Sequence, residues 1–382
     1  MEFKTKVAGR YKIEVGKSRK ERRVVADWFS NLILNQGLDY IGNRTDGDWM
    51  DWCQVGSGSG APANADVSLD SFVESTDDTD SDTGAVVDTE PDDDSAYAVT
   101  LTPAATTGAS VEFTLGSGSW ADADVDKTIT NISAGEDGIA TIISIDGAVA
   151  TCEITENFTD TNAIASGDWE LKATLYFWYR EIVYSFGQGD AEGNLSEVGV
   201  GIQEATGGLF SRALILDGEG DPTTITVLSD EYLYVTYEIR RYVSIVDVTG
   251  TVTLRGIVHD YVGRPAEILT EPDWLIPWYA DDRTSDNSDR AYDGTIGSIT
   301  EDPSGNEVNI TENIPDTNYE SGDYYLDWLL TIPVDKGNLN NYISAIKVFM
   351  SDGIYQFGFS PDIEKTSDDQ LTLTFRISWG RK

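Results

Sequence analysis

Two stretches of the chain, residues 196–240 and 344–378, repeat one pattern of apolar and polar side chains. Near the end of each stretch, residues 230–240 align without a gap with residues 368–378. Apolar and polar side chains alternate in both, so one face of a strand would carry the apolar set. That set is Leu233, Val235, Tyr237 and Ile239 in the first copy, and Leu371, Leu373, Phe375 and Ile377 in the second.

The repeat extends upstream of this strand. Residues 196–200 echo 344–348, and Gly208-Leu209-Phe210 echoes Gly353-Ile354-Tyr355 in the same order. A single alternating strand arises easily by chance, but three matched elements in one order predict a duplicated β-domain.

The rest of the chain also has a residue pattern that is typical of strands. Short runs of Thr, Val, Tyr and Trp recur between Gly, Asp, Asn and Pro, which is typical of an all-β protein. Residues 11–15 and 22–28 predict a strand pair around a turn. One short helix is expected at about residues 26–42, because Trp28, Leu32, Leu34, Leu38 and Ile41 would form an apolar face and Gly42 a stop.

A change in residue composition and strand length indicates an inserted segment. Residues 74–94 hold ten acids and no base, as in a solvated linker or loop. Short strands are then expected at 99–102, 111–115, 128–132, 139–145 and 149–154, with Asp146-Gly147 as a two-residue hairpin turn. The aromatic strand at 175–180 resumes a sheet that residues 1–73 begin, which predicts that the segment between them is an insertion.

These patterns predict an all-β protein with two related β-sandwich-like domains in tandem, an inserted small β-module and one short helix near the N-terminus. Residues 1–76 and 174–248 are expected to form the first β-domain, and 249–382 the second. An acidic linker is expected at 77–94, followed by the inserted β-module at 95–173.

Charge is distributed unevenly along the chain. The formal net charge is −41, yet residues 1–23 carry nine bases against three acids. The acidic body disfavours nucleic acid and anionic membranes, since binding to phosphates requires positive charge. We interpret residues 1–23 as a basic arm that docks on an acidic neighbouring subunit, with docking on DNA as the weaker alternative. Removing the arm should then weaken assembly and spare the fold.

Cys53 and Cys152 are the only cysteines, and neither lies in a CxxC motif or near histidines at metal-ligand spacing. A disulfide-stapled secreted scaffold is therefore not expected. The opening Met1-Glu2-Phe3-Lys4 lacks the apolar core of a signal peptide, and no apolar run reaches 18 residues. These features favour a protein made and folded in a cytoplasm.

Catalytic motifs are weak. His259, at the expected end of a strand, is the one candidate base for Ser-His-Asp or Cys-His chemistry, and a lone histidine there is more often structural. The glycines of residues 56–60 precede Pro62 and lack the Gly-Lys-Ser/Thr of a phosphate loop. The 67 acids would also form many carboxylate pairs for glycoside hydrolysis, but nothing singles one out. No catalytic, cofactor-binding or metal-binding residue is assigned, and no enzyme activity is expected.

Two weaker binding hypotheses stay open. Residues 78–84 begin like an EF-hand loop, but Gly84 falls at the seventh position and Thr89 at the twelfth, where a bidentate Glu is required. A solvated acidic loop is favoured, with a looser calcium site there or in the polar loop 281–294 as the alternative. Trp274 and Trp278 would suit a sugar-stacking platform, although burial against the sheet is favoured.

Several phrases carry a resemblance to a known group of proteins. They are Asn31-Leu32-Ile33 with Gly37-Leu38-Asp39, Val55-Gly56-Ser57-Gly58 with Ala61-Pro62-Ala63, residues 193–201, 209–215 and 222–228, and the ending at 375–381. Together they make nearly the whole chain resemble structural proteins of tailed bacteriophages. The inserted stretch is similar to a small β-module of phage tail proteins through Trp120, Asp124-Val125, Lys127-Thr128-Ile129 and residues 163–169, although Asp126 departs from the glycine expected there.

The resemblance implies a non-enzymatic virion protein of the tail, collar or fibre region, assembled in the host cytoplasm as a homo-oligomer, with the inserted module projecting outward. It carries no catalytic residue. A capsid-surface decoration or head fibre is one alternative, and a glycan-binding or glycan-cleaving tail spike is another. Expected partners are copies of the chain and other virion proteins, through the basic arm and strand edges, and a host glycan or receptor is a further candidate.

Overall fold

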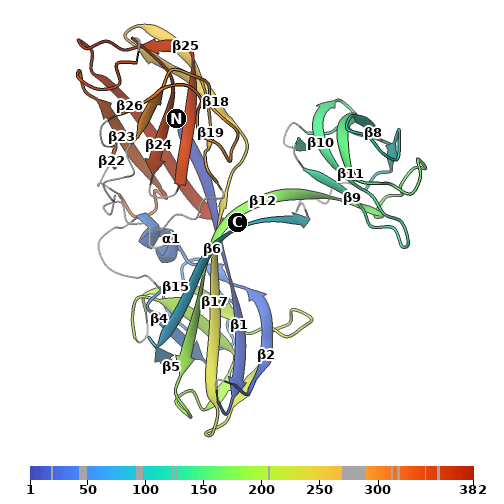
Figure 1. Ribbon diagram of the computed structural model, residues 1–382. Coiled ribbons are helices and arrows are strands. Elements are labelled where there is room, and N and C mark those ends of the chain that lie inside the picture. The colour runs from blue at the N-terminus through green and yellow to red at the C-terminus, as the bar shows by residue number, and fades with distance from the viewer. Residues whose placement is uncertain are drawn as a thin grey trace. The chain divides into compact units, whose positions relative to one another are not determined.

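The computed structural model is an all-β protein, as the sequence predicts. It describes residues 1–18, 20–42, 50–91, 98–121, 124–125, 127–204, 207–268, 289–310, 313–315, 319–339, 341–350 and 353–382 (Figure 1). These residues form 26 strands and one helix. The chain divides into two compact units, one made of Met1–Val86 with Phe177–Lys382 and the other of Val87–Tyr176. Strands β6 (Thr79–Pro91) and β12 (Trp169–Phe186) run from one unit into the other and pair with each other.

The second unit has a core of its own. Its strands β7 (Leu101–Pro103), β8 (Val111–Leu115), β9 (Thr128–Asn131), β10 (Ile139–Asp146) and β11 (Val149–Glu156) are ordered β9-β10-β11-β8-β7. Each overlaps its predicted range. The β10–β11 turn lies one residue later than expected, because Asp146 pairs with Val149 and leaves Gly147 and Ala148 as the turn. Gly147 has φ of 58°, which glycine adopts without a steric penalty.

One half of the first unit packs two sheets around a common core. The first sheet has the order β3-β15-β14-β4-β5, and its strands are β3 (Leu32–Ile33), β4 (Trp52–Gly56), β5 (Phe72–Thr76), β14 (Glu197–Gly201) and β15 (Leu209–Leu214). The second sheet continues from β6 and β12 through β17 (Tyr232–Val243) to β1 (Glu2–Gly16), beside which lies β2 (Arg22–Ser30). Buried side chains from both sheets, among them Val198, Phe210 and Tyr237, form one cluster. A short pair, β13 (Gly193–Leu195) with β16 (Ile225–Val227), lies apart from these sheets.

The other half repeats this arrangement strand by strand. Its first sheet has the order β18-β19-β25-β24-β20-β21, and its second sheet runs β22-β23-β26-β1. The strands are β18 (Val248–Leu254), β19 (Ile257–Pro265), β20 (Arg290–Tyr292), β21 (Glu307–Asn309), β22 (Asn313–Pro315), β23 (Tyr325–Ile332), β24 (Tyr342–Met350), β25 (Gly353–Glu364) and β26 (Leu371–Arg381). The strands of the two halves correspond in chain order and in their pairing. In the first half they are β4, β5, β6, β12, β14, β15 and β17, and their counterparts in the second half are β20, β21, β22, β23, β24, β25 and β26.

The two halves share strand β1. Thr5 to Gly16 pair with β17 in antiparallel fashion, whereas Glu2 to Val7 pair with β26 in parallel. The order β6-β12-β17-β1-β26-β23-β22 is therefore one sheet with matching strands on both sides of β1 (Figure 1). Fifteen residues at the usual rise of a strand span roughly 50 Å, enough to serve both halves.

The residues that the sequence repeat aligns lie at matching places in the two cores. Val198, Val200 and Phe210 are buried in the first core, and Ile346, Val348 and Tyr355 are buried in the second. The alternating apolar sets of β17 and β26 are likewise buried. The expectation of two related β-sandwich-like domains is therefore confirmed.

The predicted helix at 26–42 is too long. Helix α1 covers only Asn35–Gly42, while residues 26–30 belong to β2 and residues 32–33 form β3. The apolar residues before Asn35 face a partner strand, as in the pair Tyr11 with Phe29. Hairpin pairing with β1 thus overrides a local helical pattern, and the described helix ends at Gly42, as predicted.

The basic arm at 1–23 is not an arm. Phe3, Val7, Tyr11, Ile13 and Val15 are all buried, because β1 is an interior strand of the shared sheet. The lysines between them stand on the other face of the strand, which explains why a core strand has basic composition.

The acidic linker at 77–94 is also corrected. Strand β6 extends from Thr79 to Pro91 and pairs with β12, so most of this segment is part of a sheet. Its Thr and Val residues, interspersed among the acids, favour a strand once a partner is present.

Candidate functional site

His259 lies within strand β19 and not at its end. Its side chain is 2% exposed, and Nδ1 lies 2.7 Å from the Pro361 carbonyl oxygen. On β18, Val252 is its cross-strand partner. The imidazole is held inside the second half of the first unit by a backbone carbonyl, which is the structural role that a lone histidine usually has.

The described residues of both proposed calcium loops include strand residues. Residues 79–84 lie in β6, and residues 281–288 of the second loop lie outside the described part of the chain. At the end of that loop, Asp289 Oδ1 accepts a hydrogen bond from the Phe349 amide, and Asp293 accepts two from Asn306. Hydrogen bonds from the Asn306 side chain and amide lower the pKa of Asp293. Among the described residues, no three His, Cys, Asp or Glu side chains gather as a metal site would require.

The remaining sequence candidates divide into two groups. Trp274 and Trp278 lie outside the described residues. Cys53 and Cys152 are free, buried thiols in different units. Burial raises the pKa of Cys152 to about 12 and that of Cys53 well above its ordinary value, so both stay protonated at neutral pH.

The glycine-rich loop after β4 encloses a buried ion pair that sequence motifs do not reveal. The β14–β15 hairpin brings Glu197 and Arg212 together, since Gly199 pairs with Arg212. Glu197 Oε2 accepts hydrogen bonds from Arg212 Nε and Nη2 at 3.1 and 2.8 Å. Both residues are at most 2% exposed. A single acid in Glu-Val-Gly-Val-Gly and a single base in Leu-Phe-Ser-Arg-Ala-Leu are the only signal in the sequence.

The loop is fastened to this pair from several sides. The amides of Gly58, Asp70 and Ser71 donate to the Glu197 carboxylate at 2.8 to 3.0 Å. The Asp66 and Asp70 carboxylates lie 2.6 and 3.0 Å from the Arg212 guanidinium. A Cβ atom on Gly58 would lie 2.3 Å from Glu197 Oε1, so glycine is needed for the close approach. The glycines thus serve a loop anchor and not a phosphate site.

A second anchor occupies the matching place in the other half. Lys347 on β24 pairs with Gln356 on β25. The Lys347 ammonium lies 2.9 Å from Glu267 and 2.5 Å from Asp302. The Gln356 side chain accepts a hydrogen bond from the Gly297 amide and donates to the Ser298 carbonyl, both at 2.8 Å. In each half, polar side chains of one hairpin hold the loop that follows the neighbouring strand.

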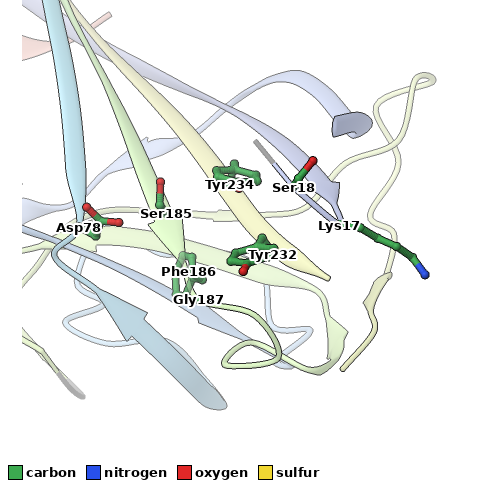
Figure 2. A pocket seen from close by; sticks show the side chains of 8 residues that line it. All are labelled: Lys17, Ser18, Asp78, Ser185, Phe186, Gly187, Tyr232 and Tyr234. Atoms are coloured by element: carbon green, nitrogen blue, oxygen red, sulfur yellow. The ribbon is translucent and has the colours of Figure 1, made fainter. Parts of the chain in front are cut away.

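The first unit has a pocket of about 300 Å³, and Figure 2 shows the side chains that line it. The β1–β2 turn, the residue before β6, the end of β12 and the start of β17 form its walls. The lining residues are Lys17, Ser18, Asp78, Ser185, Phe186, Gly187, Tyr232 and Tyr234. This volume is at the small end of the range for ligand sites.

The pocket combines aromatic rings with polar groups. Tyr232 and Tyr234 project from one face of β17 with ring centroids 6.5 Å apart, and the Arg22 guanidinium lies 3.9 Å above the Tyr234 ring. Lys17, which extends away from the rings in Figure 2, pairs with Asp230 at 2.5 Å on the surface. A partly exposed tyrosine ring beside hydroxyl and carboxylate groups suits a small polar ligand with one flat apolar side, such as a sugar ring.

No protein-family model matches the chain, and no curated protein or solved structure is significantly similar to it. In the part of the chain that the structure describes, none of the helical segments has the length and apolar character of a membrane span.

Proposed function

We propose that the chain is a non-enzymatic structural component of a tailed-phage virion, located in the tail, collar or fibre region and assembled as a homo-oligomer. The observation that carries the proposal is the duplicated sandwich joined through β1. The sequence resemblance to phage structural proteins supplies the class of particle.

The physical argument concerns what the shared strand does. Backbone hydrogen bonds connect β17, β1 and β26 directly, so displacing one half relative to the other would break a sheet ladder. Two domains joined only by a flexible linker lack this resistance. The loops in both halves are also fixed by buried polar anchors. A rigid duplicated scaffold of this kind suits a building block that must keep its geometry in an assembly.

The test is a search for the chain in purified virions by mass spectrometry, followed by a reconstruction of the particle. We expect the chain at the tail, collar or fibre, in a fixed number of copies. Its absence from purified particles would refute the virion role, and density on the capsid surface would favour a decoration protein.

A second candidate function, glycan binding, is supported by the pocket lined by Tyr232. Incubating the pure chain with host surface polysaccharide tests it. A bound polymer of unchanged length would indicate a binding protein, a shortened polymer an enzyme, and a polymer that neither binds nor shortens would exclude both. The Tyr232→Ala variant should lose binding if the pocket is the site, and Tyr342→Ala, at an exposed tyrosine in the other half, is the matched control.

A further inference from the structure

Strand β18 forms an open edge of the first unit. It pairs with β19 through a two-residue turn at Arg255 and Gly256, which have φ of 54° and 81°. The opposite side of β19 pairs with β25, so β18 is the last strand of its sheet. Among the described residues, no strand pairs with the outer side of β18.

The register of this hairpin determines which backbone groups point outward. Leu254 and Ile257 flank the two-residue turn and therefore exchange hydrogen bonds with each other. In an antiparallel ladder such pairs alternate, so the N–H and C=O groups of Thr249, Thr251 and Thr253 point away from β19. These three residues present unpaired donors and acceptors at the edge.

The side chains of β18 leave this edge unprotected. The three threonines are exposed, while Val248, Val252 and Leu254 on the other face are partly buried against the second core. The strand contains no charged residue and no proline. Both are usual devices against edge-to-edge pairing.

Six other edge strands carry a charged residue or a proline, whereas the uncharged edge strands β3, β13 and β16 have at most three residues each. Arg22 lies in β2, Glu74 in β5, Asp80 in β6, Glu307 in β21, Pro103 in β7 and Pro315 in β22. In a chain with a net charge of −41, an uncharged edge of seven residues is a departure from the pattern. It offers a place where two acidic copies can approach without opposing like charges on the strand.

The sequence of β18 is complementary to itself in one antiparallel register. With Thr251 opposite Thr251 of a second copy, Thr249 faces Thr253, so the outward groups of both strands meet as hydrogen-bonded pairs. In the same register Val248 faces Leu254 and Gly250 faces Val252. The apolar face then continues from the core of one copy into that of the other.

Charges at the ends of the strand fit the same register. Just beyond each end of the two-fold ladder, Asp247 of one copy would lie near Arg255, which is in the β18–β19 turn of the other copy. Both side chains are on the surface, at 39% and 53% exposed, where Asp247 pairs with Arg264 and Arg255 pairs with Asp369. Opposite charges thus flank an uncharged strand, which favours this pairing over a shifted one.

We propose that β18 is a docking edge for β18 of a second copy of this chain, in the antiparallel register centred on Thr251. The inference rests on the proposed assembly role and names the partner and the surface. The two sheets of six strands would then form one sheet across a two-fold axis.

Sedimentation velocity of the full chain over a range of concentrations tests the proposal. The wild type should form dimers. Thr251→Pro removes an outward N–H group and no hydrogen bond to β19, and Thr251→Lys places two like charges opposite each other. Each should weaken the dimer about tenfold or more, since the Thr251 pair contributes two hydrogen bonds. Thr251→Ser keeps the backbone donor and should dimerise like the wild type.

Further variants test the register and the specificity of the effect. Arg255→Asp should weaken the dimer, and adding Asp247→Arg should restore it, because opposite charges lie near each other again. Thr114→Lys is a matched control, since Thr114 is exposed on β8, a strand whose backbone is paired on both sides. It should leave dimerisation unchanged.

Hydrogen exchange of the wild-type chain tests the same edge without any substitution, so the result does not depend on whether a variant folds. The amides of residues 249, 251 and 253 should become protected as the concentration of the wild type rises. A chain that stays monomeric, or a dimer that forms equally well with Thr251→Pro and Thr251→Lys, would overturn the proposal. A copy of the chain found in purified virions would still support the structural role in that case, so the two ideas fail separately.

Discussion

At the residue scale, the Glu197–Arg212 pair shows how a buried charge is kept in a core. Three backbone amides and the guanidinium donate to one carboxylate, so the hydrogen-bonding capacity of Glu197 is well used. The guanidinium in turn is the one cation close to the Asp66 and Asp70 carboxylates within the described contacts. The two residues therefore act as a unit, and removing the cation would leave several negative charges without compensation.

We expect Arg212→Met to destabilise the first unit by about 3 to 5 kcal/mol, because it leaves the buried Glu197 carboxylate without its cation. Urea unfolding followed by tryptophan fluorescence measures the change. Lys17→Met is the matched control, since it removes a cation from an exposed pair with Asp230, and its unfolding midpoint should not change.

The pair can also be tested by a second substitution. Adding Glu197→Gln to the Arg212→Met variant should recover part of the lost stability, because the buried negative charge is removed. An Arg212→Met variant with the midpoint of the wild type would show that the pair does not anchor the loop.

The buried Cys152 thiol predicts a loss of stability at alkaline pH. Its pKa is about 12 in the folded state against an ordinary value of 9.0, so above pH 9 the unfolded chain releases a proton that the folded unit retains. The folded state then binds more protons, and its stability falls as pH rises, by up to about 1.4 kcal/mol per pH unit for this thiol. This contribution is complete below pH 9 and is lost progressively toward pH 12.

Unfolding of the excised second unit, residues 87–176, between pH 8 and 10.5 measures this slope. The Cys152→Ala variant should be less stable at pH 8 but should show a shallower decline, because the thiol no longer titrates. An identical decline in both proteins would contradict the assignment. Iodoacetamide should label Cys152 only after unfolding.

At the element scale, β1 is the strand on which both halves depend. Tyr11, Ile13 and Val15 belong to the first core, and Phe3 belongs to the second. We therefore expect deletion of residues 1–16 to abolish cooperative unfolding of the first unit, as measured by near-ultraviolet circular dichroism. Replacing the exposed Lys4 and Lys6 with serine removes basic charge without touching either core and should leave the melt unchanged. A folded first unit without residues 1–16 would show that β1 is dispensable.

The same elements show how far the sequence could predict the fold. Alternation within 230–240 and 368–378 predicted the core faces of β17 and β26, because side-chain period alone determines which face is apolar. The strands of the second unit were predicted for the same reason. Local pattern predicted both a strand at 22–28 and a helix at 26–42, and only pairing decides between them, since residues 26–30 lie in the hairpin with β1 and residues 32–33 pair with β15.

The candidate sites were harder to predict than the strands. The basic composition of residues 1–23 suggested a docking arm. The lysines lie on one face of β1 and alternate in sequence with the apolar residues of the other face, so composition alone does not reveal a buried strand. Glu197 and Arg212 lie 15 residues apart and meet only when the hairpin folds. The pocket near Tyr232 joins four separate segments, which no local motif can indicate.

At the scale of the whole molecule, the duplication is asymmetric in one respect. β1 is antiparallel to β17 but parallel to β26, so the two halves use the same strand in opposite senses. If the halves were separated, β1 would stay with the first half through its chain connection to β2. The second half would then lose the strand that pairs with β26. The second unit differs, because it has its own core and the chain enters it along β6 and leaves it along β12.

We therefore expect the first unit to fold without residues 87–176. Because β6 and β12 are neighbouring strands, roughly 5 Å apart, an Asn-Gly turn can join Val86 to Phe177 and close a hairpin. The shortened chain should unfold cooperatively and keep the assembly state of the full chain. Deleting residues 77–173 instead removes the part of β6 that belongs to the first unit, and that variant should be less stable. Aggregation of the first variant together with a cooperative melt of the second would place the boundary between the units at the ends of the acidic segment and not within β6.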